Sequence, residues 1–286
     1  MAIPAPYDLT NAFPAMTSGY VSAVSPLINN ATGAFANLET ATSFYLAGST
    51  SVVYDAPPPT LPSLISITFD SLFVRGFAFP ANPVFAPELQ TVQGTVRFES
   101  CKFAGALPVM PALTGVQNIE VAECSDLSTM AGAFPLVSAA QAVRLTNLPA
   151  LTTMAGAFPS LISCSSDVVV INTGLIGIDG LAVLATIDDY LYLEANNSLV
   201  NLNGFAGLVE INKALDVQAH AALTSCAGLL GVNGALWQPG GLLTGHHVRI
   251  VNNPLLPTAA QAGALIANLQ GEGYNGPVFN TGNGAG

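Results

Sequence analysis

Charged side chains are scarce in this 286-residue chain, where Asp, Glu, Lys and Arg together make up 8% of the residues. An average soluble protein has about a quarter. Lys and Arg number 6 against 17 Asp and Glu, giving a formal net charge of −11. Nucleic acids and anionic membrane surfaces are bound mainly through Lys and Arg, so we expect neither to be a partner. A surface with few lysines also does little to discourage side-by-side association, which favours assembly.

Long hydrophobic runs are absent too. The chain is 51% hydrophobic with a mean hydropathy of +0.53, yet no apolar run approaches the roughly 18 residues of a membrane-spanning helix. The first residues, Met-Ala-Ile-Pro-Ala-Pro-Tyr-Asp, lack the basic region and apolar stretch of a Sec signal peptide. We therefore expect no transmembrane segment. The expected location is an extracellular surface, a virus-like particle or a filament.

Motifs for catalysis and metal binding are missing as well. The four cysteines form no Cys-x-x-Cys pair and only three histidines occur, which argues against a zinc site. No Gly-x-Ser-x-Gly, phosphate-binding loop or dinucleotide fingerprint is found. The sequence therefore predicts no catalytic residues, no cofactor and no metal site.

What the chain does have is an apolar signature that recurs about every two dozen residues. In nine segments two apolar residues stand two positions apart, and we number the second of each pair position 0. The pairs are Phe44 and Leu46, Ile65 and Ile67, Val96 and Phe98, Ile119 and Val121, Val143 and Leu145, Val169 and Ile171, Leu191 and Leu193, Leu215 and Val217, and Val248 and Ile250. This alternation is typical of a strand with one buried face. Another apolar residue usually follows at +6, and Met-Ala-Gly-Ala-Phe-Pro occurs at both 130–135 and 154–159.

Repeats of about 20–29 residues with one strand each stack into solenoids, because a single coil cannot bury its own apolar face. We predict a mainly β protein: a single elongated parallel β-solenoid of about nine coils over residues 41–257. Residues 258–286 are predicted to form a C-terminal capping helix that begins at Thr258, followed by a Gly/Asn-rich tail. Residues 1–40 do not fit the register and are predicted to form an N-terminal cap or arm.

Positions −1 and +1 should point away from the solenoid interior. Position −1 reads Tyr45, Ser66, Arg97, Glu120, Arg144, Val170, Tyr192, Asp216 and Arg249; position +1 reads Ala47, Thr68, Glu99, Ala122, Thr146, Asn172, Glu194, Gln218 and Val251. One interpretation is a solvated sheet face with local ion pairs, since Arg97, Glu120 and Arg144 alternate in charge. The other is a partner-binding face, because Tyr and Arg are enriched in interfaces. Its anchors would be Tyr45, Arg97, Arg144, Tyr192 and Arg249.

Two spacings are long and mark insertions. The first, roughly 74–93, contains Phe77, Phe79 and Phe85, and the second, roughly 231–245, contains the only tryptophan, Trp237. Insertions in solenoids often carry contacts, which makes Trp237 a further candidate for partner binding. The alternative is that these aromatic residues fold back over the coil edge.

Two cysteines occupy equivalent positions in adjacent coils. Cys101 and Cys124 both stand at +3, and stacking brings their Cα atoms within reach of a disulfide. A stacked pair of reduced thiols fits the pattern equally well. Cys164 and Cys226 lie elsewhere in the coil and are expected to be free thiols in the core.

The later coils carry a family resemblance. Residues 191–205 read Leu-Tyr-Leu-Glu-Ala-Asn-Asn-Ser-Leu-Val-Asn-Leu-Asn-Gly-Phe, and residues 248–257 read Val-Arg-Ile-Val-Asn-Asn-Pro-Leu-Leu-Pro. These coils resemble those of receptor L-domain-like, leucine-rich-repeat-like bacterial surface proteins over residues 118–270, and less closely over 40–117. The resemblance implies a right-handed β-solenoid without an active site, used for adhesion or partner recognition.

We therefore expect a non-catalytic structural or interaction protein, displayed on a cell or particle surface and part of an assembly. Its expected partners are proteins, including copies of itself or other surface or particle subunits, and a glycan is also compatible. One alternative is an adhesion or ligand-recognition module of the L-domain type. A second is a polysaccharide-acting β-solenoid enzyme, for which Glu194 and Asp216 are the nearest candidate carboxylates.

Overall fold

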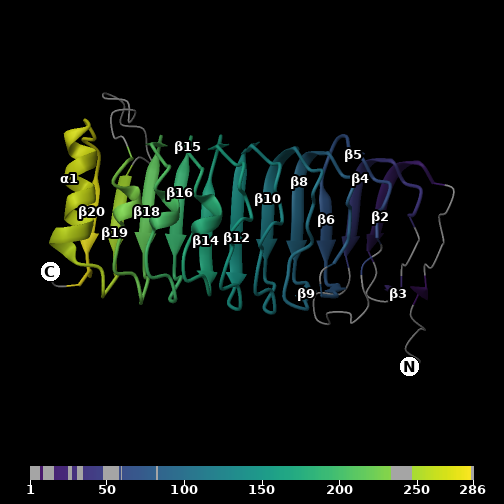
Figure 1. Cartoon of the computed structure of the whole chain (residues 1–286), viewed down its shortest axis with the longest axis horizontal. Coiled ribbons are helices and arrows are strands. Elements are labelled where there is room, and N and C mark those ends of the chain that lie inside the picture. Colours follow the sequence, from purple (N-terminus) through teal and green to yellow (C-terminus); the bar gives the residue numbers. More distant parts are fainter. Residues whose placement is uncertain are drawn as a thin grey trace.

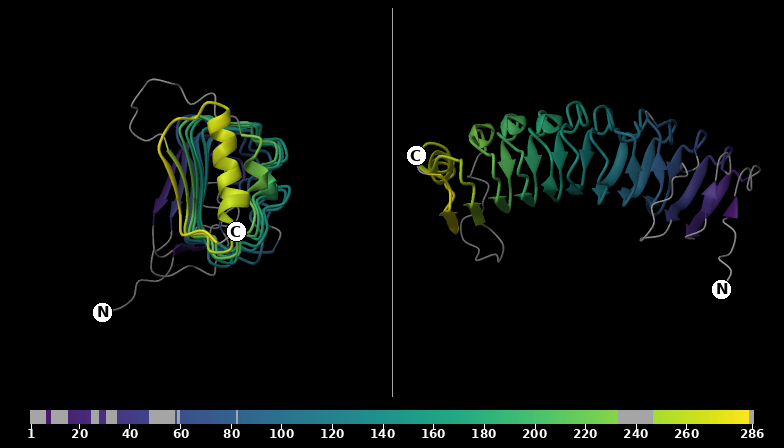
Figure 2. Two further views of the ribbon diagram at one scale, coloured as in Figure 1. Left: turned by 90° about the vertical axis from the view of Figure 1, so that its left-hand side faces the viewer. Right: turned by 90° about the horizontal axis from the view of Figure 1, so that it is seen from below.

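The computed structural model describes residues 7–8, 16–24, 28–30, 35–47, 58, 60–81, 83–232 and 247–284. The chain forms a β-solenoid of about seven turns whose strands stack along one long axis (Figure 1). Viewed down that axis, the coils superpose on one another (Figure 2). The mainly β, parallel solenoid predicted from the repeat is confirmed, and so is the C-terminal helix. No helix among the described residues is long and apolar enough to cross a membrane.

One parallel sheet of 12 strands runs along the solenoid. Its strands are β2 (Ser18–Val24), β4 (Thr40–Ala47), β5 (Ser66–Ile67), β6 (Leu72–Arg75), β8 (Thr91–Glu99), β10 (Gly115–Ala122), β12 (Ala142–Leu148), β14 (Val168–Thr173), β16 (Tyr190–Glu194), β18 (Ala214–Gln218), β19 (His247–Val251) and β20 (Val278–Thr281). Successive strands pair in register, so that Phe98 lies beside Val121 and Val121 beside Leu145. The same register aligns the outward-facing residues in columns.

Shorter elements complete the coils. Four two-residue strands form a second parallel sheet: β11 (Ala139–Ala140), β13 (Ser163–Cys164), β15 (Thr186–Ile187) and β17 (Glu210–Ile211). Two further pairs are β1 (Tyr7–Asp8) with β3 (Ile28–Asn30), and β7 (Ala78–Phe79) with β9 (Lys102–Phe103). The 3₁₀ helices η1 (Asp179–Leu181), η2 (Asn203–Phe205) and η3 (Ala227–Leu229) lie in successive coils. Coils approach closely there, since a Cβ on Gly204 would overlap the carbonyl of Ile178.

The core is the stack of inward positions. The residues at −2 and 0 of seven of the nine predicted segments are fully buried, for example Phe44, Leu46, Val96 and Phe98. The apolar residues at +6 from Leu127 onward, such as Leu151 and Leu199, are fully buried as well. Each coil thus packs its apolar side chains against the coils before and after it, as the repeat predicts.

The second predicted segment is wrong. Ile65 is 42% exposed, and Ile67 pairs with Ala41 in the short strand β5. The strand beside Phe44 and Leu46 is instead β6, through Leu72 and Val74. Both stretches show two apolar residues two positions apart, so the alternation could not choose between them. As a result Phe73 and Arg75 hold the outward positions expected for Ser66 and Thr68.

The sixth segment is out of register by one residue. Strand β14 places Val168 beside Val143 and Val170 beside Leu145, and Val168 and Val170 are fully buried. Val169 and Ile171, predicted to point inward, are half-exposed. Residues 168–171 are all apolar, so periodicity has no polar residue to fix the phase, and a one-residue slip exchanges the two faces. The outward positions are therefore Val169 and Ile171, not Val170 and Asn172.

Both ends of the sheet contain strands that the repeat did not predict. Strand β2 lies within the segment predicted as a cap or arm, and it places Val21 beside Phe44. Strand β20 lies in the Gly/Asn-rich tail and pairs with β19.

Between β19 and β20 the chain forms a π-helical segment, Thr258–Gly263, and the helix α1 (Ala264–Gly271), which lies across the C-terminal end of the stack (Figures 1 and 2). Leu265 and Leu269 anchor α1 in the core. The helical segment begins at Thr258, and the hydroxyl of Thr258 donates to the carbonyl of Gly284 at 2.7 Å.

A column of left-handed residues turns the chain out of the main sheet. Seven non-glycine residues, each two positions after the inward residue of its strand, have φ between 49° and 59°: Ser100, Glu123, Asn147, Asn172, Ala195, Ala219 and Asn252. This conformation costs a residue with a Cβ roughly 1–2 kcal/mol, and Asn tolerates it better than Ala. The stacking of the coils therefore imposes this left-handed corner at all seven positions, including those where an Ala disfavours the conformation.

A buried polar column follows at the next position. The amide Nδ2 of Asn196 donates to the carbonyl of Val170 at 2.9 Å, and that of Asn253 donates to the carbonyl of Val217 at 3.0 Å. Their Oδ1 atoms accept hydrogen bonds from the backbone N–H of Thr173 and of His220. The column thus pairs backbone groups that the corner leaves without sheet partners.

His220 occupies the same column between Asn196 and Asn253. Its Nδ1 accepts from the backbone N–H of Asn196 at 3.1 Å, whereas its Nε2 is buried without a hydrogen-bond partner. Burial lowers the pKa of His220 to about 4, against weaker opposing effects of the backbone at Asn196 and Leu193. The imidazole is therefore neutral near neutral pH.

We expect His220→Asn to make folding less sensitive to acid. The pKa of His220 is about 4 in the folded chain against 6.5 in the unfolded chain, so the unfolded state takes up the proton first. The resulting loss of stability begins as pH falls below 6.5 and is complete below about 4, reaching on the order of 3 kcal/mol. Asn would donate its amide as Asn196 and Asn253 do and would not titrate. Urea unfolding between about pH 7 and pH 4 measures the difference in free energy of unfolding between the two proteins. Because both contain the same Asp and Glu residues, the effects of these residues cancel in the difference. Equal pH dependence of the two proteins would contradict the assignment.

Ala219→Gly should stabilise the fold by about 1 kcal/mol, because glycine adopts a positive φ without steric cost. The matched control is Ala206→Gly, since Ala206 has an ordinary right-handed φ of −61°. There glycine should destabilise by about 0.5–1 kcal/mol through its greater freedom in the unfolded chain. Thermal or urea unfolding compares the two, and a loss of stability at both positions would argue against the strained corner.

Candidate functional site

The outer face of the main sheet carries the distinctive side chains of this molecule. The column at −1 follows the register of the strands and reads Tyr45, Phe73, Arg97, Glu120, Arg144, Val169, Tyr192, Asp216, Arg249 and Phe279. Val169, with Ile171 beside it at +1, divides the polar residues into two clusters. Tyr45, Arg97 and Arg144 belong to the first cluster, and Tyr192 and Arg249 belong to the second. The structure therefore does not bring all the predicted anchors together.

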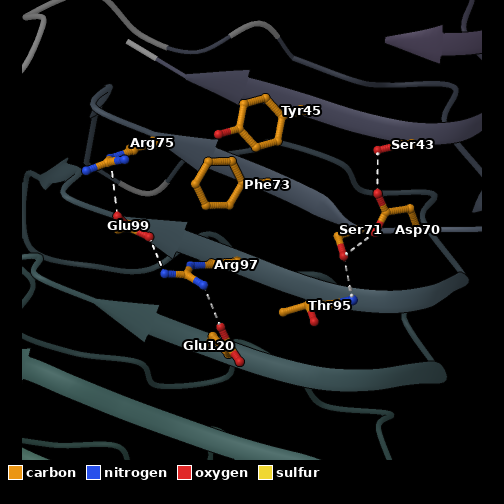
Figure 3. Close-up of a pocket in the computed structure, with 10 residues that line it drawn as sticks. All are labelled: Ser43, Tyr45, Asp70, Ser71, Phe73, Arg75, Thr95, Arg97, Glu99 and Glu120. Carbon is orange, nitrogen blue, oxygen red and sulfur yellow. Dashed lines mark hydrogen bonds and ion pairs between the residues drawn. The ribbon is translucent and has the colours of Figure 1, made fainter. Parts of the chain in front are cut away.

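The first cluster surrounds a groove of about 530 Å³ over β4, β6, β8 and β10 (Figure 3). Its lining consists of Ser43, Tyr45, Asp70, Ser71, Phe73, Arg75, Thr95, Arg97, Glu99 and Glu120. Sequence reasoning missed Asp70, Ser71, Phe73 and Arg75, because it placed the strand at 65–67. Leu72 and Val74 lie 24 residues before Val96 and Phe98, whereas Ile65 and Ile67 lie 31 residues before them, and this regular spacing could have revealed the strand.

Aromatic rings and a guanidinium group stack at the centre of the groove. The rings of Tyr45 and Phe73 lie 4.5 Å apart between centroids with an interplanar angle of 18°. The guanidinium carbon of Arg97 lies 5.5 Å from the centroid of Phe73, over the ring. The groove therefore has a preformed aromatic element that rests on neighbouring strands.

A chain of ion pairs runs along one flank of the stack. Glu99 contacts Arg75, Nε to Oε1 at 3.2 Å, and also pairs with Arg97. Glu120 bridges the next two arginines, at 3.1 Å from Arg97 and 2.9 Å from Arg144. Arg144 ends the chain on Asp167 at 2.8 Å. Partial burial would lower the pKa of Arg144, but the hydrogen bonds that its guanidinium donates to Asp167 and Glu120 outweigh this effect and raise the pKa above its ordinary value. The predicted alternation of Arg97, Glu120 and Arg144 is thus part of a longer network.

Hydroxyl groups line the opposite flank, together with one carboxylate (Figure 3). Asp70 accepts hydrogen bonds from Ser71 at 3.0 Å and from Ser43 at 3.4 Å. The Ser71 hydroxyl in turn accepts from the backbone N–H of Thr95 at 3.0 Å. Groups that both donate and accept hydrogen bonds therefore face the ion pairs across the aromatic stack.

The second cluster consists of shorter contacts around two carboxylates. The hydroxyl of Tyr192 donates to Glu194 at 2.5 Å and accepts from the amide of Gln218 at 2.6 Å. Burial, followed by this bond to Glu194, raises the pKa of Tyr192 to about 12. Asp216 is almost fully buried, with His247 Nε2 at 2.7 Å and Arg249 Nε at 3.9 Å. The predicted anchors Tyr192 and Arg249 therefore lie on the same part of the sheet, with His247 as an addition.

The stacked cysteines are free thiols in this structure. Cys101 and Cys124 are both buried, and their sulfur atoms also contact backbone carbonyls, for example Cys124 with Ala122 at 3.2 Å. A hydrogen bond with Cys101 and burial raise the pKa of Cys124 well above its ordinary value. The disulfide between them stays a prediction. Cys164 and Cys226 are free and buried, as expected.

The aromatic residues of the first insertion lie among the described residues. Phe77, Phe79 and Phe85 are buried, and Phe79 stacks on Phe103 at 4.9 Å, so the aromatic residues of the first insertion fold back onto the coils. Beside them, proline and aliphatic side chains that include Pro83, Val84 and Val109 line a shallow depression of about 350 Å³. Trp237 lies outside the described residues.

Groupings that would suit a metal ion do not occur in the described part of the chain: no three His, Cys, Asp or Glu side chains gather closely enough to hold one. Comparison with known proteins yields no match, either to a family model, to a curated protein or to a solved structure. The site has to be interpreted from its own geometry.

Glu120→Gln should destabilise the fold by about 1 kcal/mol, because it removes the charge that bridges Arg97 and Arg144 while the pairs are partly exposed. The loss should shrink in about 1 M salt, where the screening length falls to roughly 3 Å. Glu123→Gln serves as the control, since Glu123 lies in the same coil outside this network and accepts a hydrogen bond from Ser100. Urea unfolding at low and high salt gives the comparison. An effect of Glu120→Gln that salt leaves unchanged would argue against the ion-pair network.

Proposed function

We propose that this protein is a non-catalytic interaction protein, a β-solenoid displayed on a cell or particle surface that binds protein partners, including copies of itself, through the outer face of its main sheet. The observation that carries the proposal is the column of Tyr, Phe and Arg side chains held in fixed positions on neighbouring strands. Such residues dominate binding energy in protein interfaces, and a rigid sheet presents them with little loss of conformational freedom on binding.

The state of the carboxylates supports a binding role over catalysis. Glu99 and Glu120 are each paired with arginines, Glu194 is hydrogen-bonded to Tyr192, and Asp216 is bonded to His247. Glycoside hydrolysis needs two carboxyl groups flanking the scissile bond, one of them a proton donor with a raised pKa. Each of these four carboxylates is thus held in an ion pair or hydrogen bond with a side chain on the same face. This arrangement argues against the polysaccharide-acting enzyme.

Low charge and exposed apolar side chains support assembly. Outside the polar clusters, Phe69 is 81% exposed and Val84 67%. Ile162, which directly precedes β13 of the second sheet, and Leu136 are also exposed. Exposed apolar surface is a common mark of contact sites. The chain also contains few lysines, the residues that would discourage such contacts. A subunit of a surface layer, particle or filament accounts for both features.

The alternative is a ligand-recognition module of the L-domain type. Two features support this alternative. The first is the set of Asn-containing coils, in which Asn196 and Asn253 are buried and hydrogen-bond to the backbone. The second is the groove over β4–β10, which is lined by hydrogen-bonding groups. It differs from the assembly role in that the protein would remain a monomer while it binds.

Self-association of the purified protein tests the proposal. Sedimentation velocity and negative-stain microscopy should show concentration-dependent oligomers or particles. The double variant Tyr192→Ala with Arg249→Ala should weaken association by about tenfold or more, as loss of two interface anchors does. Glu210→Gln, in strand β17 of the second sheet and away from the outer face, should change association by less than about twofold. A protein that stays monomeric at all concentrations would rule out the assembly role, and an unchanged double variant would remove the outer face from it.

A further inference from the structure

The aromatic stack in the groove over β4–β10 ends with one ring face that no column neighbour covers. Phe73 lies between Tyr45 on one side and Arg97 on the other. The residue beside Tyr45 on the next strand, β2, is Ser22, which is exposed and too small to cover the ring. Tyr45 therefore offers an aromatic surface to a ligand at the open end of the stack (Figure 3).

Hydrogen-bonding groups flank this surface on both sides. Ser43, Asp70, Ser71 and Thr95 line one flank, and the paired guanidinium and carboxylate groups of Arg75, Arg97, Glu99 and Glu120 line the other. The Nε of Arg75 faces Glu99 at 3.2 Å, whereas the Nε of Arg97 is buried without a hydrogen bond. Donors and acceptors thus alternate around an aromatic centre.

The charge balance narrows the ligand class. The lining contains two arginines and three carboxylates, Asp70, Glu99 and Glu120, for a formal charge of 2 − 3 = −1. Both arginines are already paired with carboxylates, so an anionic ligand would have to compete with these pairs. A cationic ligand would be repelled by the two arginines. A peptide that adds a strand needs a sheet edge, whereas this groove lies on the face of the sheet.

We propose that the groove binds a short stretch of a neutral polysaccharide or oligosaccharide. A sugar ring places its apolar C–H face on the open face of Tyr45. Its hydroxyl groups exchange hydrogen bonds with Asp70, Ser71 and Thr95 on one flank and with Arg97 and Glu99 on the other. This inference rests on the proposed non-catalytic role, because the sugar is held and not cleaved.

The test is isothermal titration calorimetry of the full chain with two sets of probes. The neutral set comprises cello-, xylo-, manno-, malto- and chito-oligosaccharides, and the anionic set comprises oligogalacturonate and heparin fragments. We expect at least one neutral oligosaccharide to bind, with a dissociation constant between about 10 μM and 1 mM, and the anionic set to bind more weakly. Mass spectrometry of the same mixtures should show intact sugar.

Three variants locate the binding. Tyr45→Ala should weaken it by about tenfold or more, and Thr95→Trp should abolish it by filling the groove while the stack stays intact. Tyr190→Ala makes the same change on the same sheet, in β16 outside the groove, and should leave the affinity within about twofold of the original. Thermal unfolding of each variant confirms that it is folded. Since Thr95→Trp adds bulk at a half-exposed strand position where Trp is favoured, it tests the groove even if Tyr45→Ala impairs folding.

The outcomes separate this inference from the proposed function. Absence of neutral-sugar binding, tighter binding of the anionic set, or full binding by Thr95→Trp would overturn the groove assignment and leave self-association through the outer face standing. Cleavage of a bound sugar would overturn the non-catalytic role, and with it the binding-only interpretation of the groove.

Discussion

Every coil of this solenoid depends on its neighbours, because one turn of about two dozen residues has too little surface to enclose its own apolar side chains. Two constraints have to be met together. The backbone of each strand must pair with the next strand, and position 0 of one coil must lie on position 0 of the next, as Phe98, Val121 and Leu145 do. Once that register is set, every other position in the coil is set with it. The left-handed corner and the buried column of Asn196, His220 and Asn253 follow from the same alignment.

The outer face inherits its order from the same register. Strand pairing places Tyr45 beside Phe73, and Arg97 beside Glu120, although these residues lie more than 20 positions apart in the chain. Each cross-strand contact is worth only a fraction of a kcal/mol to about 1 kcal/mol, yet the row forms a continuous network from Arg75 to Asp167. The groove arises where the spacing is irregular, because the detour between β5 and β6 brings Asp70 and Ser71 to the flank of the stack. The site is therefore a local departure from the repeat that remains anchored in it.

The sequence reveals those parts of the fold that depend on alternation between apolar and polar residues. Strands such as Leu191–Leu193 are framed by polar or aromatic neighbours, and their inward residues could be predicted one by one. Residues 168–171 could not be phased, because four apolar residues in a row contain no alternation. The left-handed column could be suspected at Asn147, Asn172 and Asn252, but Ser100, Glu123, Ala195 and Ala219 give no local signal. Of the ion-pair network, Arg97, Glu120 and Arg144 were predictable from their common column, whereas Arg75 depended on the correct position of β6 and Asp167 on the geometry of a loop.

The in-register main sheet also has a mechanical consequence. Its hydrogen bonds between coils point along the long axis of the molecule, because the strands themselves run across it (Figure 1). A pull on the two ends of the stack loads these bonds along their own direction, and the bonds of one strand pair can part before the next pair yields. A solenoid tethered at one end would therefore lengthen in steps of one coil, releasing slack while the remaining coils stay intact. A force applied across the axis instead shears whole rows of packed side chains at once. The same stack is compliant in one direction and stiff in the other.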